Sequence, residues 1–180
     1  MYSRTTNMIT PREILVSFFS MIFNNMTASD WIYLAGFIDG DGSLNVQIVK
    51  RKDYLYGFQI RAYISLYQKS KYNWFLEEWQ KKLGRGSIST RKNGMSELTI
   101  LGDSNVTEML HSLVPHLLIK KNLAKLVLNI LEKKELIKNR NDFLEVCLLI
   151  DKIVVFNNSK LRKIDSLYVK KEMEMPVETK

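Results

Sequence analysis

The nine residues Leu34–Gly42, with the sequence LAGFIDGDG, constrain the fold of this chain more than any other stretch. Thr27 is followed three residues later by Asp30, which is the spacing of a capping box and predicts the start of a helix that runs into this stretch. Gly36 and Gly40 are four residues apart, so they share one face of that helix and leave it bare. Because such glycines cost helix stability, we expect a second helix to pack closely on this face.

Asp41 lies near the end of this stretch, in an unfavourable place for a carboxylate. The C-terminal end of a helix carries partial negative charge, and acidic residues favour the other end. A divalent cation held between Asp41 and the last main-chain carbonyls would remove the conflict. For an isolated Asp-Gly pair the ordinary interpretation is a solvated turn after a helix, so the metal hypothesis depends on the stretch as a whole.

The length and charge of the chain limit the classes of protein it can belong to. Its 180 residues and net charge of +8 suit one domain with its own core and a polyanionic partner. Charge alone fits a ribosomal or membrane-surface protein equally well. Cys147 is the only cysteine, which excludes an intrachain disulfide, and its apolar neighbours indicate a core residue rather than a nucleophile. His111 and His116 lie on helix-like segments and argue against a zinc site.

An apolar run at Ile14–Phe23 follows two arginines near the N-terminus. It is too short to span a bilayer, and the residues after it do not resemble a signal-peptide cleavage site. We therefore expect no membrane partner. The predicted organisation is an N-terminal extension of unknown role at residues 1–26, a folded domain at 27–171 and a disordered tail at 172–180.

Hydrophobic periodicity predicts one α+β domain. Leu44, Val46 and Ile48 alternate with polar residues, as do the apolar residues of the next strand, which is typical of strands with one buried face. Asn93-Gly94 is a strong hairpin signal. The predicted strands are 43–51, 58–67, 87–92 and 95–101, and the predicted helices are the one ending near Asp41, a short one from Trp74 stopped by Gly84, and those at 104–114, 120–137 and 142–157, with a helical tail at 157–171. The order is α-β-β-α-β-β-α followed by more helix, with a four-stranded antiparallel sheet whose apolar face lies under helices.

The other face of this sheet carries side chains that can read base edges in DNA. Arginine suits guanine, asparagine and glutamine suit adenine, and glutamate suits cytosine. An ordinary solvated sheet face is the alternative for any single residue. The candidate DNA contacts on or beside this face are Asn45, Gln47, Arg51, Tyr54, Gln59, Arg61, Tyr63, Ser65, Tyr67, Ser89, Arg91, Glu97 and Thr99. Lysines lie at its margins, where phosphates would run, at Lys50, Lys52, Lys69, Lys71, Lys81, Lys82 and Lys92.

The stretch Leu34–Gly42 closely resembles the signature of the LAGLIDADG homing endonucleases, from which it differs by Phe37 for leucine and Gly40 for alanine. The resemblance extends from about Trp31 to Lys163 and looks closest to the single-motif, homodimeric branch known from algal chloroplast introns. It implies the LAGLIDADG homing endonuclease fold, in which the four strands form a saddle in the DNA major groove. It also implies an organelle location, with the chloroplast favoured over the mitochondrion.

By resemblance, Asp41 and the carbonyl of Gly40 bind Mg²⁺, for which Mn²⁺ would substitute. Gln68 would order the water network, and Lys120 would stabilise charge on the phosphate or help to activate the nucleophile. Without the resemblance these two are ordinary polar residues at a strand end and a helix start. Tyr72 departs from the pattern, because it stands where the close relatives carry an arginine at the edge of the active site.

Only one copy of the motif is present, so one chain would supply half of an active site. Two motif helices would cross at their bare ridges and bring two Asp41 carboxylates together. The predicted dimer-interface residues are Leu34, Ala35, Gly36, Ile38 and Asp39. The resemblance also implies contacts with the DNA backbone from Ser159, Lys160 and Lys163, although a solvated tail explains these residues nearly as well.

The predicted function is that of a homodimeric, Mg²⁺-dependent, site-specific DNA endonuclease. It would make a double-strand break at a long, partly palindromic target and so start the homing of a group I intron. The alternative on the same fold is an RNA-binding maturase that assists the splicing of intron RNA. A third possibility is a catalytically silent DNA-binding module. The set of Asp41, Gln68 and Lys120 argues against both alternatives.

Overall fold

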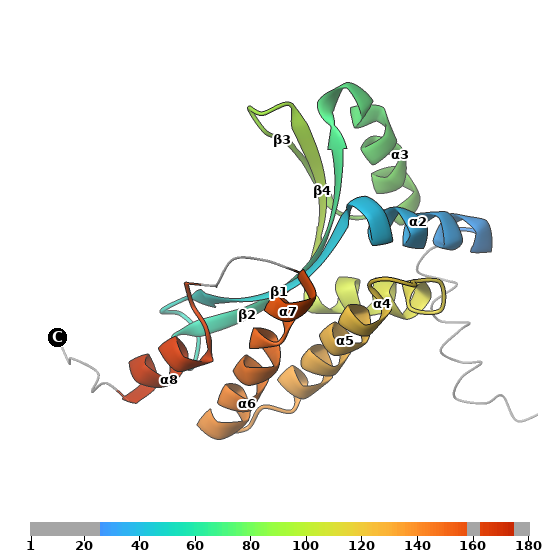
Figure 1. The fold of residues 1–180 in the computed structure, drawn as a ribbon. Helices are drawn as coiled ribbons and strands as arrows, with labels where there is room; N and C mark the ends of the chain where they lie inside the picture. Colours follow the sequence, from blue (N-terminus) through green and yellow to red (C-terminus); the bar gives the residue numbers. More distant parts are fainter. Residues whose placement is uncertain (1–25, 158–162, 175–180) are drawn as a thin grey trace, which may run out of the picture.

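The computed structural model describes residues 26–157 and 163–174. It shows a strongly curved sheet with helices on its convex side (Figure 1). The α+β architecture with a four-stranded antiparallel sheet is therefore confirmed. The elements are α2 (Ala28–Asp41), β1 (Gly42–Lys50), β2 (Phe58–Lys69), the 3-10 turn η1 (Ser70–Tyr72), α3 (Asn73–Leu83), β3 (Ser87–Thr90), β4 (Met95–Leu101), α4 (Asp103–Leu113), α5 (Lys121–Glu135), α6 (Arg140–Asp151), α7 (Ile153–Asn157) and α8 (Ser166–Glu174).

The strands are arranged in the order β1-β2-β4-β3, and every neighbouring pair is antiparallel. The β1–β2 ladder runs from Gly42 opposite Leu66 to Lys50 opposite Phe58. Strand β2 continues to Lys69, two residues further than the alternating pattern predicts, so Gln68 lies inside the strand. Its last residues pair with β4, which explains why the strand does not stop where the hydrophobic alternation fades.

The core lies between the convex face of the sheet and the helices. Alternate residues of β1 and β2, among them Leu44, Val46 and Ile64, are fully buried and pack in one cluster with residues of α2, α4 and α5. Each such side chain contributes about 1.5–3 kcal/mol when it is removed from water. Cys147 belongs to the same cluster, and burial raises the pKa of its thiol to about 12. The prediction of a core cysteine is confirmed.

The C-terminal helices differ from the prediction in two places. The sequence predicts one helix at 142–157, but α6 ends at Asp151 and α7 begins at Ile153. The N–H of Lys152 donates to the carbonyl of Leu149 at 3.2 Å, which tightens the last turn and ends the helix. The predicted helical tail at 157–171 is observed as α8, which begins at Ser166 and ends at Glu174. Residues 172–174 therefore belong to a helix and not to the predicted disordered tail, and Glu172 forms an ion pair with Lys50. Among the described helices, none has the length and apolar character needed to cross a membrane.

Helix α2 begins as the sequence predicts, with a capping box in which the Thr27 hydroxyl accepts the N–H of Asp30 and the Asp30 carboxylate accepts the N–H of Thr27. Leu34, Ala35 and Ile38 are fully buried in the core of their own chain. The prediction that these three side chains lie on the helix face available to a partner is therefore wrong. The period of 3.6 residues places them opposite the glycine ridge rather than on it.

Gly42 joins α2 directly to β1 and has no room for a side chain. A Cβ atom at this position would lie 2.6 Å from the Cα of Ile38, which is closer than two non-bonded carbon atoms can approach. The N–H of Gly42 donates to the carbonyl of Ile38, so the chain leaves the helix in a single step. The close turn from helix to strand fixes where Asp41 is held.

We predict that Gly42→Ala destabilises the fold by about 1–3 kcal/mol, because the added methyl group must displace main-chain atoms of α2. Thermal unfolding followed by circular dichroism measures the loss. Gly40→Ala is the matched control, since a Cβ there meets no atom within 4 Å and alanine favours helix. A Gly42→Ala protein as stable as the control would contradict the close-packing argument.

Candidate active site and nucleic-acid interface

Asp41 is the last residue of α2 and is exposed, as the sequence predicts. Lys120 approaches the same end of the helix from the segment before α5. Its Nζ atom donates to the carbonyls of Ile38 and Asp39, at 2.7 Å in each case. An ammonium group at the C-terminal end of a helix offsets the partial negative charge there, so Lys120 also makes the position of Asp41 less unfavourable.

Two features of its environment shift the pKa of the Lys120 ammonium in opposite directions. Burial lowers the pKa of the ammonium below its ordinary value, while the negative charges of Asp39 and Asp41 oppose the shift. Burial is the larger effect, as expected when a cation loses part of its hydration. The structure therefore brings Lys120 into the electrostatic field of Asp41.

Asp39 is used inside its own chain. Its carboxylate accepts main-chain N–H groups from Leu118 at 2.7 Å, Ile119 at 3.1 Å and Lys120 at 2.8 Å. The prediction places Asp39 in a dimer interface, but in the structure both of its carboxylate oxygens accept hydrogen bonds from main-chain N–H groups of the segment before α5. Nothing in the local sequence signals this pairing, because the two segments are 81 residues apart.

Gln68 lies at the same end of the sheet as Asp41. Gly42 is opposite Leu66 in the β1–β2 ladder, so Gln68 comes just after the last paired residues of this ladder. Its side-chain oxygen accepts the N–H of Lys69 at 2.9 Å. Tyr72 follows in η1 and is exposed, with the Lys71 ammonium 4.8 Å from its ring centroid.

The donor atoms at this end of α2 suit a hard divalent cation, which prefers carboxylate and carbonyl oxygens. One chain offers few of them: within residues 26–157 and 163–174, no group of three or more histidine, cysteine, aspartate or glutamate side chains is placed to hold a metal ion. Asp41 is exposed, and the Gly40 carbonyl lies beside it in the sequence.

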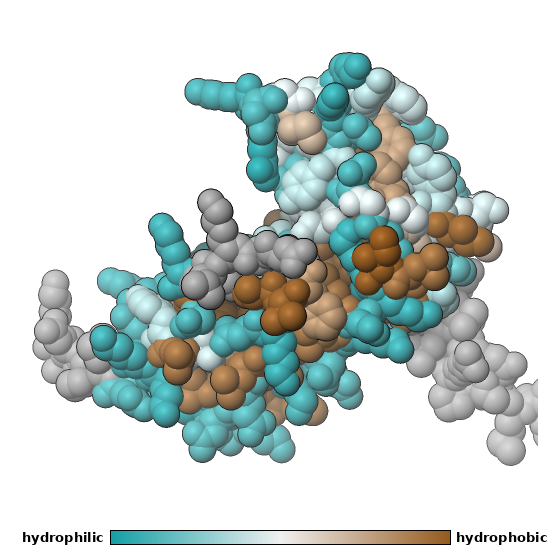
Figure 2. All heavy atoms as spheres, in the orientation of Figure 1, coloured by the Kyte–Doolittle hydropathy of each residue, from teal (hydrophilic) through white to brown (hydrophobic). Residues whose placement is uncertain are grey.

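The glycine ridge of α2 is exposed. A Cβ atom at Gly36 or Gly40 would meet no atom of this chain within 4 Å, so neither glycine is needed for packing inside the chain. Ile32 and Tyr33 lie on the same face and are 57% and 58% exposed. Figure 2 shows hydrophobic residues at the surface beside α2. The ridge is thus a narrow apolar strip that a second helix can approach closely.

The concave face of the sheet gathers the predicted DNA contacts. Asn45 is opposite Tyr63 and Gln47 is opposite Arg61, and residues directly opposite in antiparallel strands project to the same face. The exposed members of the predicted set are Gln47, Arg51, Tyr54, Lys69, Lys71, Ser89 and Arg91, and the half-buried members are Asn45, Gln59, Arg61, Tyr63, Tyr67 and Thr99. Lys163 is exposed, whereas Ser159 and Lys160 lie outside the described residues.

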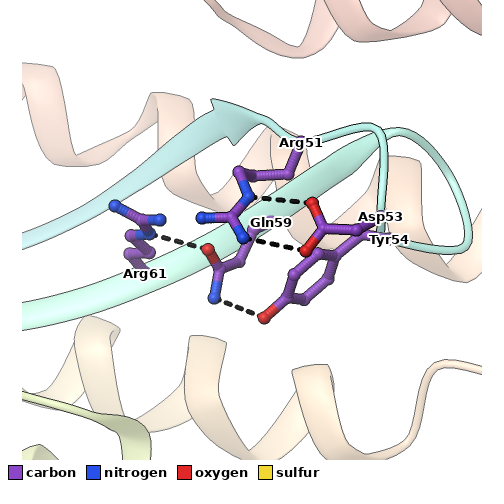
Figure 3. A network of polar contacts seen from close by, with 5 residues as sticks. All are labelled: Arg51, Asp53, Tyr54, Gln59 and Arg61. Carbon is purple, nitrogen blue, oxygen red and sulfur yellow. Dashed lines mark hydrogen bonds and ion pairs between the residues drawn. The ribbon is translucent and has the colours of Figure 1, made fainter.

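Hydrogen bonds order one end of this face (Figure 3). Arg51 forms a two-pronged ion pair with Asp53, with N–O distances of 2.8 and 2.9 Å. Gln59 donates to the Tyr54 hydroxyl at 2.6 Å and accepts from Nε of Arg61 at 2.7 Å. Arg51, Gln59 and Arg61 therefore each have a hydrogen-bond partner at this end of the face. Asp53 is not among the predicted residues of this face, although it stands only two residues after Arg51 in the sequence.

Ser65 and Glu97 are exceptions, because both are buried rather than exposed. Glu97 accepts a hydrogen bond from the Ser65 hydroxyl at 2.7 Å and pairs with Arg91, whose guanidinium lies 5.9 Å from the Tyr67 ring centroid. Burial raises the pKa of Glu97, but hydrogen bonds from Ser65, Arg91 and Tyr67 together outweigh it, so the pKa lies below its ordinary value. The prediction that these two side chains are exposed is wrong, since alternation shows the face of a side chain and not its depth.

The comparison with known proteins agrees with this architecture. The family model of the LAGLIDADG endonucleases matches residues 34–123, which include the helix end, the sheet and Lys120. DNA endonuclease I-CvuI of Chlorella vulgaris is 39% identical over 132 residues, covering 73% of this chain and 82% of the relative. DNA endonuclease I-CreI of Chlamydomonas reinhardtii is 35% identical over 150 residues, covering 83% and 91%. The chain belongs to the LAGLIDADG endonuclease family.

A crystal structure of the homing endonuclease I-CvuI, solved with DNA in the presence of Mg and with the DNA not cleaved, superposes with a TM-score of 0.76. It is 36% identical and the match covers 81% of this chain and 93% of that one. A second I-CvuI structure, with its target DNA and Ca, gives a TM-score of 0.77 at 35% identity, over 82% of this chain and 94% of that one. The fold predicted from the resemblance is therefore confirmed.

Proposed function

We propose that two copies of this chain form a Mg²⁺-dependent endonuclease that makes a double-strand break at a specific, partly palindromic DNA site. The observation that carries the proposal is the end of α2, where the exposed Asp41 lies beside Lys120 and at the end of a bare glycine ridge. The DNA complexes of the related I-CvuI support DNA as the substrate.

The exposed glycine ridge supports the proposed dimer. If α2 of one copy packs against α2 of a second copy along Gly36 and Gly40, the two C-terminal ends lie close together. Each copy then contributes one Asp41 to a shared centre. This arrangement would add the Asp41 carboxylate of the second copy to the oxygen donors of the first.

Mg²⁺ fits the oxygen donors that we assign to it, which are the Asp41 carboxylate and the Gly40 carbonyl. When bound, the metal would polarise the phosphate and lower the pKa of a water molecule. Lys120 holds its ammonium group at the helix end, where it would stabilise negative charge on the phosphate. Gln68 would order the attacking water. The Mg and Ca used with I-CvuI support a divalent cation, and we expect Mn²⁺ to substitute.

Recognition is assigned to the concave face of the sheet. Its arginine, glutamine and asparagine side chains suit base edges, and the lysines at its margins suit phosphates. The network of Figure 3 would hold Arg61 and Gln59 ready for contact before DNA binds. The net charge of +8 would speed association with DNA.

The biological setting is proposed from the relatives, which come from green algae. We infer that the enzyme starts the homing of a group I intron in an organelle, with the chloroplast favoured. The direct test is cleavage of a plasmid that carries the intron-insertion sequence, with and without Mg²⁺. Binding of intron RNA without cleavage would favour a maturase, and DNA binding without cleavage would favour a silent binding module.

Asp41→Asn should abolish cleavage and leave DNA binding unchanged or tighter, because a pair of facing carboxylates becomes neutral. Plasmid linearisation and a gel-shift titration measure the two effects. Glu145→Gln, at an exposed site on α6, is the control and should cleave normally. An Asp41→Asn enzyme that cuts at the wild-type rate in Mg²⁺ would refute the metal assignment.

Gly36→Leu should prevent dimer formation, since a branched side chain does not fit where two helix backbones nearly touch. The fold itself should survive, because a Cβ at Gly36 meets no atom of its own chain. Analytical ultracentrifugation gives the oligomeric state, and circular dichroism checks the fold. A wild-type protein that stays monomeric at micromolar concentration would contradict the dimer before any variant is made.

Arg61→Ala and Lys71→Ala should impair DNA binding in different ways. Arg61 lies in mid-strand on the concave face, so its loss should cost roughly 1–3 kcal/mol and relax preference at one position in each half-site. Lys71 lies beyond β2, and its loss should weaken binding to all sequences and flatten the salt dependence by about one phosphate contact per subunit. Binding-site selection with salt titration separates the two. Altered sequence preference for Lys71→Ala alone would show that the assignment of this face is wrong.

A further inference from the structure

The segment that carries Lys120 to the active site has little packing of its own. Leu118 and Ile119 are 85% and 79% exposed, so burial of apolar surface does not hold them in place. Leu117 is the buried anchor, and Lys120 follows three residues later at the start of α5. A lysine side chain has about 2 kcal/mol of rotamer entropy to lose when it is fixed. Something other than the hydrophobic core must fix this segment.

The carboxylate of Asp39 supplies the missing constraint. One oxygen accepts the N–H groups of Leu118 and Ile119, and the other accepts the N–H of Lys120. Hydrogen bonds to an ionised carboxylate are shorter and roughly twice as strong as those between neutral groups. Asp39 therefore binds the main chain on both sides of the exposed residue Ile119.

The contact is reciprocal. The side chain of Asp39 holds the main chain of Lys120, and the side chain of Lys120 donates to the main-chain carbonyls of Ile38 and Asp39. These hydrogen bonds thus link the end of α2 to the segment before α5, which is far away in the sequence. If Asp39 served only to cap α5, the side chain of Lys120 would not need to turn back onto α2, the helix that carries Asp39.

We propose that Asp39 is a positioning residue, whose carboxylate fixes the Nζ atom of Lys120 beside Asp41 and so sets the rate of cleavage rather than the affinity for DNA. This inference rests on the proposed nuclease function. It gives Asp39 a role inside each active site instead of a place in the dimer interface.

The test compares Asp39→Asn with the wild-type protein in two measurements. Single-turnover cleavage of bound target DNA should slow by up to about a hundredfold, since a misplacement of roughly 1 Å can cost this much. The Kd for the same DNA should stay within about twofold, which is about 0.4 kcal/mol. Asp151→Asn is the matched control, because Asp151 also accepts a main-chain N–H, from Ser166 at 3.1 Å, far from the α2 end in the sequence.

A third measurement, the chemical labelling of lysines, does not depend on cleavage. An amine-reactive acylating reagent, followed by mass spectrometry, reports the access of each lysine. In the wild-type protein Lys120 should react slowly, because its Nζ is bonded to two carbonyls, and Asp39→Asn should make it react faster while the exposed Lys163 stays unchanged. Asp39→Glu, which keeps the charge and lengthens the side chain, should give an intermediate rate.

Unchanged cleavage and unchanged labelling of Lys120 in Asp39→Asn would overturn the proposal. Loss of the folded state in both Asp39 variants would overturn it as well, because Asp39 would then be a residue of stability. If the wild-type protein does not cleave DNA while the labelling changes as expected, the nuclease assignment fails and the positioning of Lys120 stands.

Discussion

The main-chain carbonyl of Ile38 links the end of α2, the start of β1 and Lys120, and the candidate active site depends on this link. It accepts the N–H of Gly42, which turns the chain from α2 into β1, and the Nζ atom of Lys120, which brings α5 to the same point. The turn is so tight that no side chain fits at Gly42. Helix end, strand start and lysine are therefore fixed together, and Asp41 is exposed between them.

The two faces of α2 serve different purposes. The face with Leu34 and Ile38 belongs to the core and supports the sheet. On the opposite face, a Cβ atom at Gly36 or Gly40 would meet no atom of the described chain within 4 Å. Two glycines in a helix cost about 0.8–1 kcal/mol each relative to alanine. In the dimer that we propose, the close approach of a partner helix offsets this loss.

Local patterns predict most of the fold but little of the tertiary pairing. The capping box of Thr27 and the alternation in β1 and β2 depend on neighbours in the sequence, so they are visible without a structure. The pairing of Asp39 with residues 118–120, and the burial of Glu97 against Ser65, depend on contacts between distant segments. The break at Lys152 involves neither glycine nor proline. Gln68 and Lys120 were found only through resemblance to a family, because neither stands in a distinctive local pattern.

We propose that the Asp41 residues of two chains form one shared active centre. It is tested most directly with a heterodimer of one wild-type and one Asp41→Asn subunit, purified through two different affinity tags and given target plasmid under single-turnover conditions. We expect folded heterodimers that bind the target and yield no linear plasmid, since each strand cut would need both carboxylates. Linear product at half the wild-type rate or more would show that each subunit works alone and that the active centre is not shared.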